Sequence, residues 1–271
     1  MRANEVNDYG YHTIQWSDSW SSDGLFLDLP VGLVSDFTAD VYFNDFNSGT
    51  SYVTAGSSLD LTNEWESTDI GTVTAECSLF VDGGLTLALI NTDAADNEGK
   101  VLQYRNEMVW PIAGRRIAFE ALVGVADADD MDVYIGIGEK LTTFMGTTGA
   151  ISGSAVNYAG FHILQSEGTG IASCVARGGS GSAVDAGNAS SATVGDSTHT
   201  SGTLTNFHRY GIRIEDTTIV KFYFDGVKVQ ETALSTGFDD ATTITLCSVG
   251  SGATADITAV GYVALAQTRD A

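Results

Sequence analysis

The chain has 271 residues, of which 43% are apolar, and 12 Lys and Arg against 35 Asp and Glu give a formal net charge of −23. This apolar fraction is sufficient for a substantial core and excludes a globally disordered chain. The shortage of Lys and Arg argues against nucleic-acid binding, and no apolar run reaches the roughly 18 residues that a membrane-spanning helix needs.

Residues 1–40 carry several aromatic side chains among Asp and Ser and follow no clean strand or helix period. They lack the apolar stretch of a secretory signal, so we expect no cleaved export signal. Two interpretations are open: the first strands of the domain, or an N-terminal arm that packs on a neighbouring molecule. We favour a docking arm, because aromatic side chains dominate interface energetics. The expected docking residues are Tyr9, Tyr11, Trp16, Trp20 and Phe26.

Alternation of apolar and polar residues with a period of two predicts most of the regular structure. In 116–123 (RIAFEALV), for example, Ile117 and Phe119 point to one face and Glu120 to the other. Residues 220–229 (VKFYFDGVKV) predict a hairpin, because Asp-Gly between two β-rich runs favours the positive φ angles of a type I′ turn. Further strands are predicted at 85–90, 210–214 and 256–264.

Residues 177–206 are rich in Gly, Ser, Thr and Ala and predict a long loop that is either mobile or ordered by a partner. Helix signals are nearly absent, and turn residues separate many short strands. The sequence therefore predicts an all-β fold, an antiparallel two-sheet jelly-roll sandwich over residues 41–271 that follows the N-terminal arm of residues 1–40.

Catalytic motifs are scarce. No G-x-S-x-G serine elbow occurs, and the Gly-rich stretches, including GIGEK at 136–140, lack the context of a phosphate-binding loop. Sugar-cleaving jelly rolls need two facing carboxylates, and the single Glu-x-Glu is Glu64-Trp65-Glu66. We interpret it as a solvated strand start beside a buried Trp65. We therefore expect no enzymatic activity.

Three cysteines lie far apart in strand-like contexts and are expected to be buried free thiols. They are Cys77, Cys174 and Cys247. His208 opens a strand and is expected at its rim, not in a catalytic role. A lectin-like aromatic platform is a further alternative, although aromatic residues in sandwiches more often belong to the core. The tryptophans available for it are Trp16, Trp20, Trp65 and Trp110.

We expect no cofactor, with calcium as an alternative, because hard cations favour clustered carboxylates. Two acidic turns provide such clusters, and neither has the Gly and terminal Glu of an EF-hand loop. The stronger candidate calcium site is DADDMD, with Asp127, Asp129, Asp130 and Asp132. The second is DAADNE, with Asp93, Asp96, Asn97 and Glu98.

Several stretches together resemble a family of virion structural proteins of tailed bacteriophages, especially marine ones, over roughly residues 41–267. The segments that carry the resemblance are VYFNDF (41–46), Trp65, GGLTLALINTDAADNE (83–98), Leu102-Gln103, GRRIAFEALVGVADADDMDVYIGIGE (114–139), GFH (160–162), FYFDGVKV (222–229) and DITAVGYVALAQ (256–267). The resemblance implies a concanavalin A/laminin-G-like jelly roll. It brings no catalytic residues.

The function implied is a capsid decoration (cement) protein on the outer surface of the major capsid lattice. The expected partners are the major capsid protein and further copies of this chain in a dimer or trimer, without nucleic acid or membrane. The expected location is the capsid surface of the virion, after assembly in the host cytoplasm. The alternative is a carbohydrate-binding adhesion module of a head or tail appendage that binds a host glycan. A hydrolase of host polysaccharide is a third class, which the missing acidic strand motif argues against.

Overall fold

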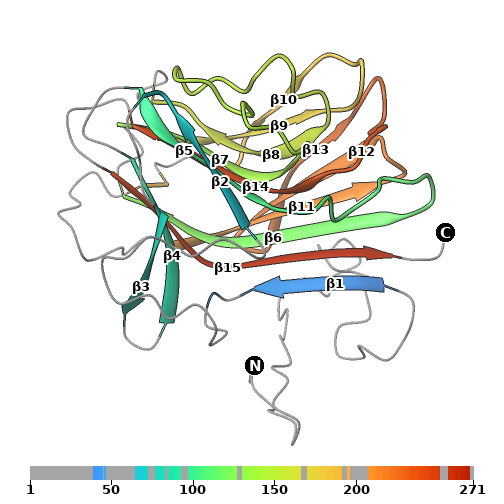
Figure 1. The fold of residues 1–271 in the computed structure, drawn as a ribbon. Helices are drawn as coiled ribbons and strands as arrows, with labels where there is room; N and C mark the ends of the chain where they lie inside the picture. The colour runs from blue at the N-terminus through green and yellow to red at the C-terminus, as the bar shows by residue number, and fades with distance from the viewer. Residues whose placement is uncertain are drawn as a thin grey trace, which may run out of the picture.

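The computed structural model describes residues 39–44, 46, 65–72, 77–82, 85–92, 97–126, 130–165, 170–190, 194–195, 207–250 and 256–268. Within these ranges the chain forms two antiparallel β-sheets that stack face to face (Figure 1). No helix in this described part is both long and apolar enough to cross a membrane.

The larger sheet has eight strands in the order β13-β12-β11-β6-β15-β4-β3, with β1 also paired to β15. Its strands are β1 (Ala39–Asn44), β3 (Cys77–Asp82), β4 (Leu85–Asn91), β6 (Arg116–Val125), β11 (Phe207–Glu215), β12 (Ile219–Phe224), β13 (Val227–Ala233) and β15 (Ile257–Thr268).

The second sheet has seven strands in the order β10-β9-β8-β7-β14-β5-β2. Its strands are β2 (Trp65–Ile70), β5 (Glu98–Tyr104), β7 (Met131–Gly138), β8 (Tyr158–Ile163), β9 (Ala172–Arg177), β10 (Val184–Asn188) and β14 (Thr243–Gly250). Non-sequential neighbours such as β7 and β14 mean that the chain crosses between the sheets several times, as in a jelly roll.

The long strand β15 joins two parts of the larger sheet. It pairs with β4 through 257–260 and with β1 through 263–268, while β6 runs along its other edge. The register with β6 shifts between Val260 and Tyr262, on either side of Gly261. Such a bulge bends a strand and increases its twist, which lets one strand serve two partners in succession.

The main core lies between the sheets and is built from alternate residues of each strand. Phe161 of β8 lies 5.1 Å from Tyr210 of β11 and 5.7 Å from Phe222 of β12, measured between ring centroids. All three side chains are essentially inaccessible to solvent. The predicted alternation is confirmed, because Ile117 and Phe119 belong to this core and Glu120 does not.

The fold class predicted from the sequence is confirmed, as is the hairpin: β12 and β13 flank Asp225 and Gly226, which have φ angles of 50° and 82°. The three cysteines are buried and free. One prediction was too simple. The stretch 177–206 contains the edge strand β10, whose backbone pairs with β9 although its composition resembles a loop. The predicted N-terminal arm lies outside the described residues.

Candidate functional site

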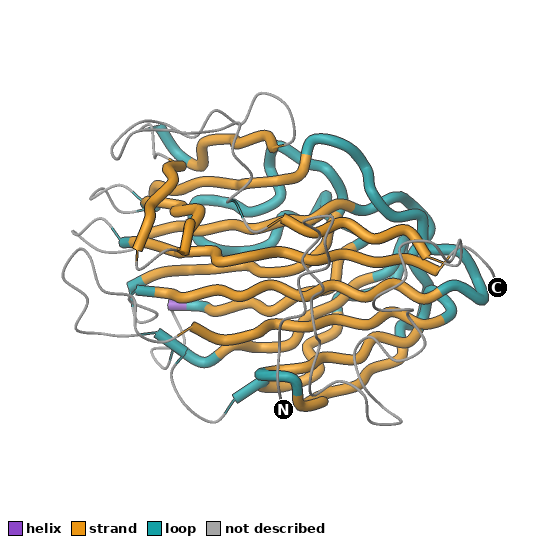
Figure 2. The backbone as a smooth tube through the Cα atoms, turned by 90° about the horizontal axis from the view of Figure 1, so that it is seen from below, coloured by secondary structure: helices purple, strands orange, loops and turns teal. Residues whose placement is uncertain are grey.

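Loops gather at one end of the sandwich, which we call the loop end (Figure 2). It is formed by segments 105–115, 139–157, 178–183 and 234–242, where β5, β7 and β9 end and β8 and β14 begin. Backbone hydrogen bonds join these segments, for example from Met108 N to Thr242 O (3.0 Å) and from Glu139 N to Asn157 O (3.0 Å). The loop end is therefore an ordered surface.

Asn157 is the centre of this surface and is fully buried. Its Nδ2 donates to Glu139 Oε1 at 2.6 Å and to Asp239 Oδ1 at 2.9 Å. Its Oδ1 accepts from the backbone N–H groups of Gly179 (2.9 Å) and Asp239 (3.1 Å). One side chain thus fixes three loops, and a buried amide with all of these partners is a stable arrangement.

The consequence is a close pair of carboxylates. Because both oxygens bond to the same nitrogen, the 2.6 and 2.9 Å distances place Glu139 Oε1 and Asp239 Oδ1 no more than about 5.5 Å apart. A pair this close is compatible with a retaining glycosidase and too close for an inverting one. Glu139 is half-buried and its Oε2 accepts from Val156 N at 3.2 Å. Asp239 is exposed, and its Oδ2 has no hydrogen-bond partner in the described part of the chain.

Gly179 backs this carboxylate pair. Its φ is +47°, and a Cβ built on it would lie 2.6 Å from Asp239 Oδ2. Both the positive φ and the close approach require glycine here. The Gly-rich stretch GGSG at 178–181 therefore has a structural role beside Asp239.

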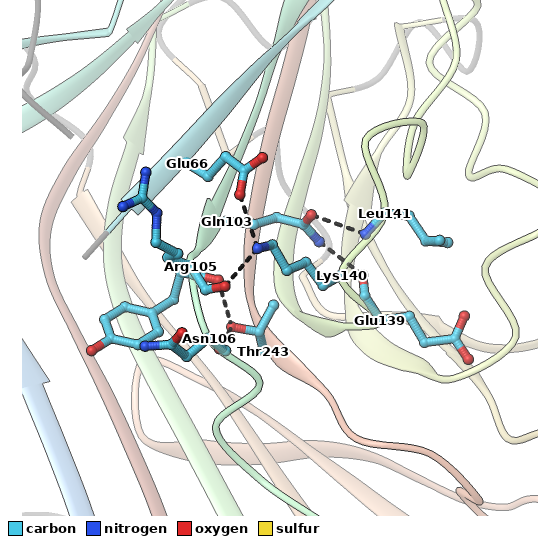
Figure 3. A network of polar contacts seen from close by, with 9 residues as sticks. Glu66, Gln103, Arg105, Asn106, Glu139, Lys140, Leu141 and Thr243 are labelled. Carbon is cyan, nitrogen blue, oxygen red and sulfur yellow. Dashed lines mark hydrogen bonds and ion pairs between the residues drawn. The ribbon is translucent and has the colours of Figure 1, made fainter. Parts of the chain in front are cut away.

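Gln103 of β5 holds the backbone on both sides of Lys140, directly after Glu139, as Figure 3 shows. This buried side chain donates from Nε2 to Glu139 O at 2.8 Å and to Thr245 Oγ1 at 2.9 Å, and its Oε1 accepts from Leu141 N at 3.1 Å. The position of Glu139 is thus determined by the sheet below it and not by the loop alone.

Lys140 completes the network at the β2 edge (Figure 3). Its Nζ lies 2.9 Å from Glu66 Oε2 and donates to Arg105 O at 2.6 Å. The hydrogen bond and charge of Lys140 lower the pKa of Glu66. Glu66 is therefore an ion-pair partner at the rim, and Trp65 beside it is buried, as expected from the sequence.

A second apolar cluster fills the outer face of the seven-stranded sheet. Tyr134 of β7 packs against Phe144 at 4.8 Å and Tyr158 at 6.4 Å between ring centroids, and its hydroxyl donates to Ile137 O at 2.8 Å. The ring of Tyr134 lies over Gly160, where a Cβ would approach its atoms to 2.5 Å. Segment 139–157 therefore covers the middle of this face.

His162 lies under the same segment, with Nε2 2.9 Å from Gly149 O. Burial lowers the pKa of His162, against the raising effects of this hydrogen bond and of Asp185. The imidazole is thus neutral in the folded protein at pH values where an unfolded histidine, of pKa about 6.5, begins to protonate. Protonation favours the unfolded state, so this group stabilises the fold above about pH 6.5 and less as the pH falls.

We therefore expect the melting temperature of the wild type to fall more between pH 7 and pH 5 than that of the His162→Gln variant. Burial raises the pKa of the neighbouring Asp132 carboxyl. Asp132 therefore adds to the stability of the fold as the pH falls, and its effect is opposite in sign to that of His162. Because Asp132 is present in both proteins, the difference between the two melting curves isolates His162. Parallel curves from scanning fluorimetry would contradict the assignment.

The predicted calcium ligands are not assembled in the described residues. Asp132 is buried on β7 and accepts from Gln165 N at 2.8 Å, while Asp127 and Asp129 lie outside the description and Asp130 is half-buried. No group of three or more potential metal ligands occurs among the residues described. Calcium binding at this turn stays a prediction. In the second turn, Asp93 and Asp96 also lie outside the description.

The docking residues predicted for the arm, Tyr9, Tyr11, Trp16, Trp20 and Phe26, lie outside the described residues, so they stay predictions. Of the tryptophans considered as a platform, Trp65 is 4% exposed and Trp110 is 56% exposed. His208 lies at the strand rim, as predicted, with Nδ1 2.8 Å from Asp225 Oδ2.

Sequence reasoning missed Glu139, Asn157 and Asp239. Glu139 belongs to the GIGEK stretch, which was considered only as a phosphate loop, and Asp239 lies 100 positions away in a turn-rich stretch. A strand pattern of alternating carboxylates could not reveal a pair that comes from two separate loops. The only local signal was an acidic residue directly after a strongly apolar strand.

No family model and no curated protein matches the sequence. Solved structures do match the fold. An endo-1,3-β-glucanase from Streptomyces sioyaensis is similar with a TM-score of 0.52 at 17% identity, covering 85% of this chain and 96% of that one. A glycoside hydrolase family 16 endo-glucanase from Bacteroides ovatus gives 0.51 at 11% identity, covering 82% and 98%. A β-agarase A gives 0.51 at 15% identity, covering 84% and 92%.

These similarities support the concanavalin-like jelly roll and correct two predictions. The assignment as a capsid decoration protein, and the expectation of no enzymatic activity, are contradicted, because the three solved structures named above, which share this fold along almost their whole length, are glucanases and an agarase. Hydrolysis was excluded on the absence of a strand motif alone, whereas in the structure two loops bring the carboxylates of Glu139 and Asp239 together. The phage resemblance, the oligomer and the virion location stay predictions that no observation tests.

Proposed function

We propose that this protein is a carbohydrate-active enzyme that hydrolyses a β-linked polysaccharide, with a β-glucan or an agarose-type galactan as the substrate class. The observation that carries the proposal is the pair Glu139 and Asp239, held by Asn157 within about 5.5 Å at the loop end. The resemblance of the fold to glucanases and an agarase supports the substrate class.

The two carboxylates differ in a way that suits two roles. Both oxygens of Glu139 accept N–H donors, from Asn157 and Val156, so its position is fixed as a nucleophile requires. Asp239 is exposed and has one oxygen without a partner in the described residues, so it can give a proton to the leaving oxygen and later take one from water. Attack by Glu139 forms a glycosyl ester as the glycosidic bond breaks, and water then releases the sugar.

The direct test is the release of reducing ends from a soluble β-1,3-glucan, a mixed-linkage β-1,3-1,4-glucan and agarose by the purified full-length chain. We expect hydrolysis of at least one of them with retention of configuration at the anomeric carbon, followed by NMR of the first products. Absence of reducing ends from all three would overturn the proposal. Inversion would overturn the assigned roles, because an inverting enzyme needs a wider separation of its carboxylates.

A further inference from the structure

Trp110 is the most exposed aromatic side chain in the described structure, with 56% of its surface accessible, although it directly follows the buried Val109. In the described part of the chain, the other large apolar side chains with high exposure are Ile112 (44%) and Val227 (64%). The indole makes no ring contact and no hydrogen bond within the described residues. Burial in the core therefore does not explain this tryptophan.

The backbone that carries Trp110 is nevertheless held firmly. Gln267, itself buried, accepts from Trp110 N through Oε1 at 3.3 Å and donates from Nε2 to Trp110 O. Val109, which precedes Trp110, exchanges two backbone hydrogen bonds with Thr242. After Trp110, Gly114 N of the same loop donates to Asp216 Oδ1 at 2.8 Å. An indole on a backbone that is fixed on both sides loses little conformational entropy when it binds a ligand.

This tryptophan belongs to the same loop end as the carboxylate pair. Val109 N donates to Thr242 O at 3.2 Å, and Thr242 N donates to Val109 O at 3.0 Å. Thr242 follows Asp239 by three residues, so Trp110 and Asp239 belong to two segments of the loop end that pair with each other.

We propose that Trp110 is a stacking platform for a sugar ring of the polysaccharide, outside the pair that performs the chemistry. The inference rests on the proposed function, since it takes the same polymer as the ligand. A pyranose ring has an apolar C–H face and a hydroxyl edge, which match an exposed indole with polar groups around it. Arg115 of the same loop and Asp216, which is bonded to this loop, provide these polar groups.

Other occupants fit less well. The formal charge of −23 opposes approach to the anionic surface of a membrane. Among the described residues of the loop end, the exposed large apolar side chains are Trp110 and Ile112 of one loop, whereas a stable protein–protein interface buries about 800 Å² on each partner. A repeating polymer needs only one ring on the indole, and neighbouring rings add contacts elsewhere on the surface.

The test compares Trp110→Ala, Trp110→Phe and the control Val227→Ala, whose exposed side chain lies at the opposite end of the sandwich, after β12. Affinity is measured by retardation in native gels that contain the soluble β-1,3-glucan, the mixed-linkage glucan or low-melting agarose. We expect Trp110→Ala to weaken binding about tenfold, as for truncation of an interface aromatic, and the other two variants to stay near the wild type. With a cleaved substrate, Trp110→Ala raises KM and leaves kcat unchanged. Circular dichroism and melting temperature verify that each variant is folded.

The outcomes separate the two proposals. Retardation of the wild type without release of reducing ends overturns the proposed hydrolysis, and the Trp110 variants still decide the platform. If Trp110→Ala and the wild type bind the polymers with equal affinity, the platform alone is overturned. The same holds if light scattering shows that Trp110→Ala changes only the oligomeric state of the protein. A wild type that none of the three polymers retards overturns both.

Discussion

Replacing Phe161 with alanine is expected to lower the free energy of unfolding by about 3–5 kcal/mol. Phe161 is completely buried, and its ring contacts Tyr210 and Phe222 from the opposite sheet at 5.1 and 5.7 Å. Removing the ring loses the burial of its own surface and leaves a cavity that two stacked sheets cannot close, because their separation is determined by all the other side chains of the core. Urea denaturation followed by intrinsic fluorescence measures the loss.

The matched control for Phe161→Ala is Val227→Ala, at the first residue of β13, whose side chain is 64% exposed. We expect this change to alter stability by less than about 0.5 kcal/mol, since it leaves no cavity. The slope of the free energy against urea concentration should stay the same in both variants, because the surface exposed on unfolding hardly changes. A loss below about 1 kcal/mol for Phe161→Ala would mean that the two sheets do not pack through this residue.

The sequence was sufficient for the parts of the fold that local patterns determine. Alternation along 116–123 predicted which side chains of β6 enter the core, and Asp225-Gly226 predicted the turn between β12 and β13. Both depend on residues that are neighbours in the chain. The period of a strand and the φ preference of a turn are properties of a few consecutive residues, so they can be derived without knowing what packs around them.

Other features depended on contacts that the sequence does not show. Strand β10 has few large apolar residues, and its pairing with β9 supplies the order that its composition does not suggest. From the sequence, Tyr134 is expected to be one residue of an ordinary strand. In the structure, segment 139–157 covers Tyr134 and forms a second apolar cluster with it. In each case the partner comes from another part of the chain, so no local pattern could predict it.

The candidate site is the clearest example of such a contact. Glu139 and Asp239 are separated by 100 positions, and the buried amide of Asn157 brings them together. A search for two carboxylates on one strand considered only Glu64 and Glu66, and the structure uses Glu66 for an ion pair with Lys140. Loops supply the residues of many binding sites because the sheets beneath them hold their ends in fixed positions.

The variants Glu139→Gln and Asp239→Asn are each expected to lower kcat on the cleaved polysaccharide by at least about 100-fold, the contribution typical of a positioned acid, base or nucleophile. In both variants an amide oxygen remains to accept from Asn157. Asp239→Asn should therefore leave the melting temperature nearly unchanged, whereas Glu139→Gln loses the acceptor for Val156 N and should lower it modestly while the fold is kept. The control is Glu107→Gln, an exposed carboxylate of the same loop end with no hydrogen bond or ion pair in the described residues, which should keep full activity. Since a glutamine cannot form the glycosyl ester, small anions such as azide should restore turnover in the Glu139 variant by attacking in its place, and the product would then have inverted configuration. Equal kcat in wild type and both variants would remove these carboxylates from the reaction.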